Sequence, residues 1–303
     1  MLTSAIDRYL ELRRALGYKL ITEERLLRCF AGFATACGDR HVVSETVLAW
    51  AARSTTARQR DKRTRVVIGF ARFMHAEDPR HAIPPPPLPS AAHTRPLPHI
   101  FSPQEIVQLM TAAVHLPPEE SLRPLTFSTL FGLLACTGLR ISEALSLRLD
   151  DLRPDGLIIR ETKFQKSRLL PLHATTTCAL NRYLERRLCV VGKSDHLFVS
   201  LKGTPVCYDT ASRTFRHLCA TAGLDGVPPV RRPRLHDLRH TVAVRALEAC
   251  PHVRDDVTAH MLALSTYLGH CSVRGTYWYL QSSPQLMQDV AGAAQDWLAG
   301  DAP

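Results

Sequence analysis

The chain has 303 residues, of which 45% are hydrophobic, and it carries a formal net charge of +10. This length and apolar content exclude a disordered protein and are typical of two globular domains. No apolar run reaches the roughly 18 residues that span a bilayer, and the first residues lack the segments of a signal peptide, so a cytoplasmic location without a membrane partner is expected. The basic excess favours a polyanionic partner, most often nucleic acid.

The positive charge is uneven along the chain. Residues 1–98 contain 16 Lys and Arg against 9 Asp and Glu, a net of +7, whereas the remaining 205 residues have a net of +3. The nine cysteines include no Cys-x-x-Cys pair, so reduced thiols are expected rather than a zinc or redox motif. The first third is therefore the better candidate for general phosphate binding.

Before residue 84, apolar residues recur at helical spacing. Helices are predicted over residues 5–16, after an N-cap at Thr22, from Ser44, and over residues 57–75. Together they predict a compact four-helix domain over residues 1–83.

A run of basic residues opens the last of these helices. A solvated helix face is the alternative, but only one acid interrupts the bases, which favours contact with a DNA backbone. The predicted contacts are Arg53, Arg58, Arg60, Lys62, Arg63 and Arg65.

Proline dominates residues 84–98, where seven of 15 residues are proline. Such a segment cannot be helical and is expected to be extended, so it predicts an interdomain linker.

The second domain, residues 99–303, is predicted to be mixed. Ser102, Pro103 and Glu105 are a strong helix start. A buried helix near residues 125–136 breaks at Thr137–Gly138, and another runs from Arg140 to Leu147. Residues 157–162 and 167–172 predict a β-hairpin, and residues 284–299 predict a C-terminal helix. The expected fold is mainly α with a small β-hairpin or sheet, an α+β protein.

A set of polar motifs runs through this second domain. It comprises Arg140 at the end of Thr-Gly-Leu-Arg, Lys163 in the hairpin, His236 and Arg239 in His-Asp-Leu-Arg, His270 at the end of Leu-Gly-His, and Tyr279 nine residues later. Arginine, lysine and histidine can bind one phosphodiester, and a tyrosine hydroxyl can attack it. In this order and spacing, the chain resembles the tyrosine recombinases of the phage integrase family over nearly its whole length.

The resemblance implies a two-domain DNA clamp, with a helical core-binding domain and a catalytic domain. It implies site-specific recombination of double-stranded DNA through a 3′-phosphotyrosine, without metal, ATP or another cofactor. Arg140 and Arg239 would clamp the scissile phosphate, with Glu143 as a candidate support for Arg140. His270 would donate a further hydrogen bond, and His236 would serve as base or hydrogen-bond partner of the attacking hydroxyl.

Two roles, the general acid and the nucleophile, each have two candidate residues. Lys163 is the candidate general acid from the register of the family, with Lys166 and Arg168 as phosphate contacts. Tyr277 is a rival nucleophile, but two residues on a helix differ by about 200°, so only one tyrosine can face the pocket. The nine-residue spacing from His270 favours Tyr279.

Several alternatives remain open from the sequence. His236 and His240 have the i, i+4 spacing of a zinc protease helix, although the glutamate base and a third ligand are missing. A DNA-binding subunit without catalysis and a topoisomerase-like strand-passing enzyme are further alternatives.

The resemblance also implies self-association on DNA, as a tetrameric synapse. It leaves open whether partner recombinases are needed, and whether the C-terminal helix docks on its own protomer or a neighbour. The sequence around Tyr277–Leu280 further resembles a subgroup encoded by mobile elements, which suggests integration or excision of such an element.

Overall fold

The computed structural model describes residues 2–87, 97–160, 167–190, 194–226, 232–249 and 254–269, with Thr276 and Tyr279. The chain divides into two compact units, Met1–Arg95 and Pro96–Pro303, and the division falls within the predicted linker. The described residues are mainly helical with one small antiparallel sheet, which confirms the predicted fold class. Over these ranges, no helix combines the length and apolar character needed to cross a membrane.

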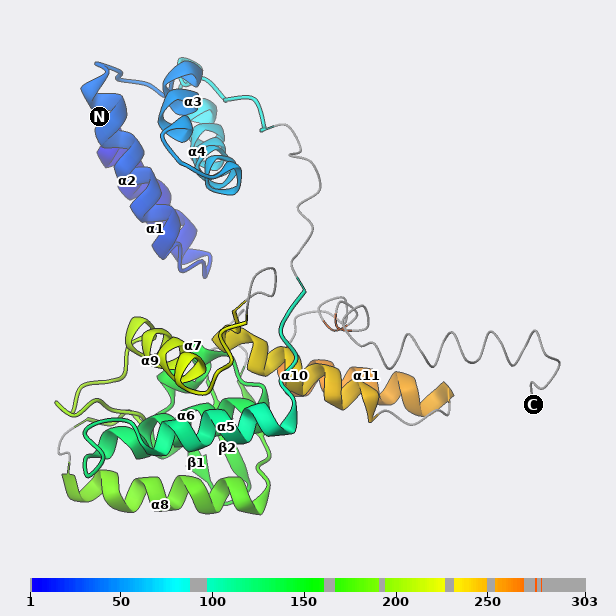
Figure 1. The fold of residues 1–303 in the computed structure, drawn as a ribbon. Helices are drawn as coiled ribbons and strands as arrows, with labels where there is room; N and C mark the ends of the chain where they lie inside the picture. Colours follow the sequence, from blue (N-terminus) through cyan, green and yellow to red (C-terminus); the bar gives the residue numbers. More distant parts are fainter. Residues whose placement is uncertain are drawn as a thin grey trace. The chain divides into compact units, whose positions relative to one another are not determined.

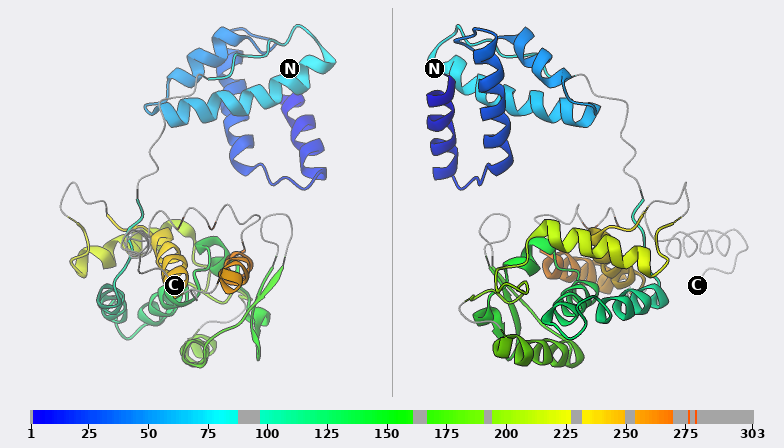
Figure 2. Two further views of the ribbon diagram at one scale, coloured as in Figure 1. Left: turned by 90° about the vertical axis from the view of Figure 1, so that its right-hand side faces the viewer. Right: turned by 60° about the vertical axis from the view of Figure 1, so that its left-hand side comes forward.

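Four helices make up the described part of the first unit (Figure 2). They are α1 (Leu2–Ala15), α2 (Ile21–Ala36), α3 (Ser44–Ala52) and α4 (Ala57–Glu77). Each contributes to one core, in which Leu10, Phe30, Trp50 and Phe70 are buried. The rings of Phe30 and Trp50 meet edge to face at 5.5 Å, an arrangement that aromatic pairs prefer.

The predicted N-cap at Thr22 is wrong. The N-cap of helix α2 lies two residues earlier, at Leu20, which has a left-handed φ of 48°, and the helix begins at Ile21. Leu20 is partly buried against the core of the first unit, which favours this position over the local preference for a threonine cap.

The second unit combines seven α-helices, a short 3₁₀ helix and three strands among its described residues (Figure 1). In chain order they are α5 (Pro103–Val114), α6 (Leu122–Thr137), α7 (Ile141–Ser146), η1 (Leu149–Asp151), β1 (Leu152–Arg153), β2 (Gly156–Ile159), β3 (Arg168–Leu170), α8 (Ala174–Val190), α9 (Tyr208–Thr221), α10 (Leu235–Glu248) and α11 (Arg254–Leu268). Helix α6 contacts α5, α8 and α10, so its apolar residues are buried along most of its length.

The start of α5 has the predicted capping arrangement. The Glu105 backbone N–H donates to Ser102 Oγ at 3.1 Å, and the Ser102 N–H donates to Glu105 Oε2 at 2.7 Å. Pro103 occupies the first turn, where its missing N–H removes no helical hydrogen bond.

The sheet contains the predicted hairpin. Strands β2 and β3 pair antiparallel, with Leu157 opposite Leu170 and Ile159 opposite Arg168. Strand β1, which the sequence did not predict, adds a third short strand to β2. The register places Arg168 opposite Ile159, at the end of the strand pair from which the connecting loop departs.

Candidate active site

Arg140 is positioned by a helix break. Helix α6 ends at Gly138, whose φ of 63° favours glycine, and a Cβ there would lie 3.1–3.3 Å from the side chains of Leu268 and Val242. The chain can therefore turn tightly against α10 and α11 before α7 begins. Arg140 follows in extended conformation, as the residue that precedes α7.

The Arg140 guanidinium is held from two sides. It donates to Glu143 Oε1 at 2.7 Å and to the carbonyl of Gly269 at 2.9 Å, and the Arg140 backbone N–H donates to Glu143 Oε2 at 3.1 Å. The side chain remains 31% exposed, so an anion from solution can still reach it. The Glu143 carboxylate and the Gly269 carbonyl thus orient the Arg140 guanidinium and leave it accessible to an anion.

Arg239, on α10, is almost completely buried, with 2% exposure. Its guanidinium donates to the carbonyls of Gly138 and Leu268, both at 2.7 Å. Burial lowers the pKa of Arg239, and the positive charge of Arg140 lowers it further, while Tyr279 and Glu143 act in the opposite direction. The two cations lie close to one another, which makes an additional anion electrostatically favourable beside them.

His236 and His240 lie one turn apart on α10. Their rings make an edge-to-face contact at 4.6 Å, and the ring of His240 lies 5.3 Å from that of Tyr279. Desolvation by the surrounding protein lowers the pKa of His236 to about 4, with Arg239 adding to the effect, although this residue keeps an exposed surface. Burial and His236 lower the pKa of His240 to about 4. Both rings are therefore neutral near pH 7.

Tyr279 is buried, with 3% exposure. It belongs to a small apolar cluster with residues of α10 and α11, including Val244, Leu247 and Leu264. A side-chain hydrogen bond with Tyr279 raises the pKa of Arg239 and so opposes the effect of burial. The structure therefore brings Arg140, His236, Arg239 and Tyr279 into one region.

His240 is a residue of this region that the sequence interpretation did not place in the site. Its position one helical turn after His236 was the available signal. As for the zinc alternative, the groups of three metal-ligand side chains found in the described ranges do not include these two histidines.

Glu143 connects Arg140 to a second arginine. Arg168 on β3 donates to both Glu143 oxygens, at 3.0 and 3.3 Å, and to the carbonyl of Tyr267 at 3.0 Å. Burial raises the pKa of Glu143, but Arg168 and Arg140 outweigh it, so the pKa is lowered and the carboxylate stays ionised. The Arg168 side chain is only 12% exposed. Its described contacts lie within the protein, and the DNA contact predicted for it stays a prediction.

Three predicted site residues, Lys163, Lys166 and His270, lie outside the described residues, as do the rival Tyr277 and the C-terminal helix 284–299. Their roles remain predictions.

The predicted DNA contacts of the first unit are mostly exposed. Arg53, Arg58, Arg60, Lys62 and Arg65 are exposed, whereas Arg63 is half-buried. The Arg63 guanidinium donates to the carbonyl of Trp50 at 3.1 Å, so part of its hydrogen-bonding capacity is used internally.

A groove of about 590 Å³ lies beside the basic start of α4. It runs between α1, α2 and α4, and its lining includes Arg13, Arg58, Lys62 and Arg65. This placement supports phosphate binding by the first unit without testing it.

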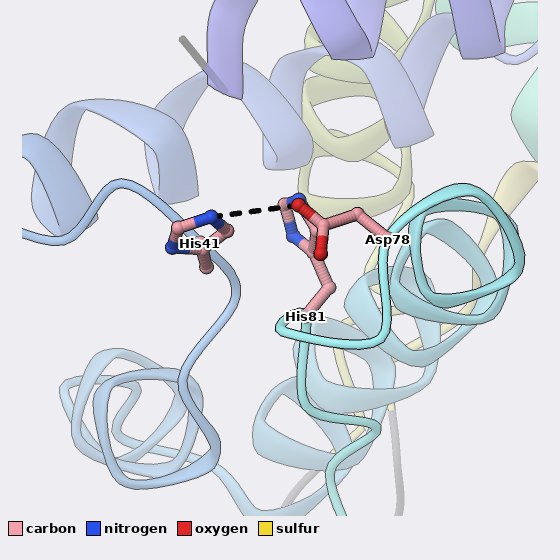
Figure 3. A group of neighbouring side chains, drawn as sticks. All are labelled: His41, Asp78 and His81. Carbon is pink, nitrogen blue, oxygen red and sulfur yellow. Dashed lines mark ion pairs between the residues drawn. The ribbon is translucent and has the colours of Figure 1, made fainter.

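His41, Asp78 and His81 are the one group in the described ranges with metal-ligand geometry (Figure 3). However, the Val42 backbone N–H donates to His81 Nδ1 at 3.0 Å, so the neutral ring carries its proton on Nε2. Hydrogen bonds from Arg80 lower the pKa of Asp78 to about 2 and occupy both of its oxygens. The Val42–His81 bond connects the segment after α4 to the chain before α3, and we assign no metal to the group.

Residues 100–285 match the model of the phage integrase family. The chain belongs to this family of tyrosine recombinases. The recombinase is 41% identical over 296 residues to y4rB of Sinorhizobium fredii, named as an integrase/recombinase, with 94% of each chain covered. It is 31% identical over 202 residues to the tyrosine recombinase XerD of Corynebacterium glutamicum, covering 65% of this chain and 61% of the relative.

Solved structures share the fold of the recombinase. A lambda integrase tetramer bound to a Holliday junction matches with a TM-score of 0.64 at 17% identity, covering 92% of this chain and 77% of that chain. At this identity the likeness concerns the fold. The family match and the curated relatives establish a tyrosine recombinase, an enzyme of DNA strand breakage and rejoining.

Proposed function

We propose that this protein is a site-specific recombinase that cleaves and rejoins DNA through a 3′-phosphotyrosine on Tyr279. The observation that carries the proposal is that Arg239 lies within electrostatic reach of Arg140 and forms a side-chain hydrogen bond with Tyr279. Two guanidinium groups fixed by backbone carbonyls, with one tyrosine beside them, are suited to a phosphodiester and its nucleophile.

In the cleavage step, Tyr279 Oη attacks the scissile phosphorus. The hydroxyl proton passes to His236, an oxygen–phosphorus bond forms, and the bond to the 5′ oxygen breaks as Lys163 protonates that oxygen. Arg140 and Arg239 balance the charge that develops on the non-bridging oxygens. The reverse steps rejoin the strand, and the phosphotyrosine bond retains the energy needed for this.

The histidine pKa values fit a base that is activated by substrate. Without DNA, desolvation by the surrounding protein and Arg239 keep His236 neutral, with a pKa of about 4. A phosphate beside Arg140 and Arg239 offsets their positive charge and raises that pKa toward its ordinary range. DNA binding would therefore strengthen His236 as a base at the moment it is needed.

The first unit is proposed to hold the DNA backbone, and the assembled recombinase is proposed to act as a tetramer on paired sites. The relationship to y4rB, which is named as an integrase/recombinase, supports a role in moving a genetic element. The lambda integrase neighbour forms a tetramer on a Holliday junction, and its shared fold supports the tetramer proposed here.

A covalent-trapping experiment tests this function. A binding site is first selected from a random duplex library, and a nicked suicide substrate with that site is then incubated with wild type, Tyr279→Phe and Tyr277→Phe. Wild type and Tyr277→Phe should form a protein–DNA adduct that resists denaturation, and Tyr279→Phe should not. No adduct with wild type would refute the function, and an adduct with Tyr279→Phe but not Tyr277→Phe would refute the assignment of the nucleophile.

A further inference from the structure

Three separate segments of the second unit meet at the Arg168 side chain. Arg168 lies on the predicted hairpin, Glu143 lies on α7 one turn from Arg140, and Tyr267 is in the last turn of α11. The Arg168 guanidinium donates to the Glu143 carboxylate and to the Tyr267 carbonyl. Arg168 thus links the hairpin with Glu143, which pairs with Arg140, and with the end of α11. The carbonyls at that end, of Leu268 and Gly269, accept from Arg239 and Arg140.

The turn after α11 is built around this guanidinium. Gly269 has a φ of 68°, and a Cβ at this position would lie 2.5 Å from an Arg168 nitrogen. The Gly269 carbonyl in turn accepts from Arg140 at 2.9 Å. Arg168 therefore lies against the residue whose carbonyl orients Arg140, in addition to sharing Glu143 with it.

We propose that Arg168 is a positioning residue that sets the orientation of Arg140 through Glu143 and Gly269. Glu143 is 8% exposed and pairs with both arginines, so it cannot turn toward one without weakening its bonds to the other. The planar fork of Arg168 fixes both Glu143 oxygens at once, which a lysine cannot reproduce. The inference rests on the proposed cleavage of DNA by Arg140, Arg239 and Tyr279.

This role differs from a phosphate contact in what it predicts for binding. A side chain that contacts a DNA phosphate contributes about 0.9 to the slope of log K against log salt. A positioning residue with its donors inside the protein contributes nothing to that slope. Arg168→Gln should therefore leave the salt dependence of DNA affinity unchanged and reduce the cleavage rate.

The test compares adduct formation at saturating DNA for wild type, Arg168→Gln, Arg168→Lys and a matched control, Arg160→Gln. Arg160 belongs to the same hairpin but pairs with Asp150 and Asp151, away from Arg140. We expect Arg168→Gln to be slower by on the order of 30- to 100-fold, because small misplacements of a catalytic group cost about that much. Arg168→Lys should be intermediate and Arg160→Gln close to wild type.

A methylphosphonate at the scissile position separates positioning of Arg140 from a general structural role. This group lacks one charged oxygen, so the reaction depends less on the arginine that balances that charge. The defects of Arg140→Ala and Arg168→Gln should both shrink on this substrate, and the double variant should be within about 3-fold of Arg140→Ala on the ordinary substrate.

The outcomes are distinct. Equal defects of Arg168→Gln on both substrates, or additive defects with Arg140→Ala, would overturn the positioning role. A salt slope reduced by about one unit would identify a phosphate contact instead. If Arg168→Gln does not fold, Arg168→Lys and Glu143→Gln carry the same comparison. Absence of any adduct with wild type would instead count against the proposed function.

Discussion

The two units of the recombinase use positive charge in opposite ways. In the first unit, Arg58, Lys62 and Arg65 are exposed along one helix start and border an open groove. In the second unit, Arg168 and Arg239 are largely buried and their guanidinium groups are bound to carbonyls or a carboxylate. Exposed charges attract a polyanion in a salt-dependent way, whereas fixed, desolvated charges stabilise a reacting group.

This difference predicts that affinity and chemistry can be separated by mutation. Changes in the first unit should alter how tightly DNA is held, and changes around Arg239 should alter how fast it is cut. Substitutions at Arg239 and on α4 test that separation, and smaller effects on stability are expected at the α10 histidines and the helix caps.

The largest effect is expected at Arg239. Arg239→Gln removes a buried cation whose position is fixed by the Gly138 and Leu268 carbonyls. Adduct formation should fall on the order of 10³-fold, as is typical for loss of one preorganised charge donor, while DNA affinity changes less than about 3-fold. Single-turnover trapping and equilibrium binding measure the two quantities, and a parallel loss of both would break the proposed separation.

The converse is expected for α4 of the first unit. A triple variant, Arg58→Gln, Lys62→Gln and Arg65→Gln, should weaken DNA binding by about 10- to 100-fold and reduce the salt slope by up to roughly 3, with cleavage at saturating DNA unchanged. Arg8→Gln, an exposed arginine of α1 paired with Glu77, is the control. An unchanged slope in the triple variant would place the DNA contacts elsewhere.

The two histidines of α10, of which His240 is buried and His236 is exposed, predict a pH dependence of stability in the second unit. With pKa values lowered to about 4, His236 and His240 bind fewer protons in the folded state than in the unfolded state between about pH 6.5 and 4. Stability is therefore complete above pH 6.5 and declines as pH falls to 4, by about 2 kcal/mol for His240 once solvent screening is allowed for, and by less for the exposed His236.

Hydrogen exchange in peptides of α10 measures this loss at pH 7 and 5, after correction for intrinsic rates. Substitution of the buried histidine, His240→Asn, should reduce the pH effect, and His115→Asn, at an exposed position outside α10, should not. Equal protection of wild type at both pH values would show that these histidines titrate normally.

The smallest effect is expected at the helix caps. Ser102→Ala removes a capping box at α5 and should cost about 1 kcal/mol of unfolding free energy, with Thr56→Ala at α4 costing the same or less. Urea titrations measure both. Neither variant should change the adduct rate per folded molecule, and a large change for Ser102→Ala would extend the site to α5.

The sequence was sufficient to predict features that depend on residues close together in the chain. The Ser102 cap, the break at Gly138 and the hairpin strands were predictable because capping, left-handed turns and β-pairing depend on near neighbours. The cap at Thr22 was predicted wrongly because the N-cap position is taken by Leu20, which packs against the core of the first unit. Strand β1 pairs with β2 across a tight turn, but its two residues are too few to show a strand pattern in the sequence.

The same limit applies to the site. The residue types and order of Arg140, His236, Arg239 and Tyr279 were visible in the sequence as a resemblance to a family. The neighbours of Arg168 were not, since Glu143 and Tyr267 lie 25 and 99 residues away from it. From the sequence alone, a basic residue in a lysine-containing hairpin predicts a DNA contact, and its contacts with Glu143 and Tyr267 become visible only in the structure.

The most direct test of the proposed cleavage through Tyr279 is to locate the covalent bond between protein and DNA. Trapped wild-type adduct is digested with nuclease and protease, and the modified peptide is sequenced by mass spectrometry. We expect a nucleotide joined through its 3′ phosphate to Tyr279. A nucleotide on Tyr277, or one joined through a 5′ phosphate, would contradict it.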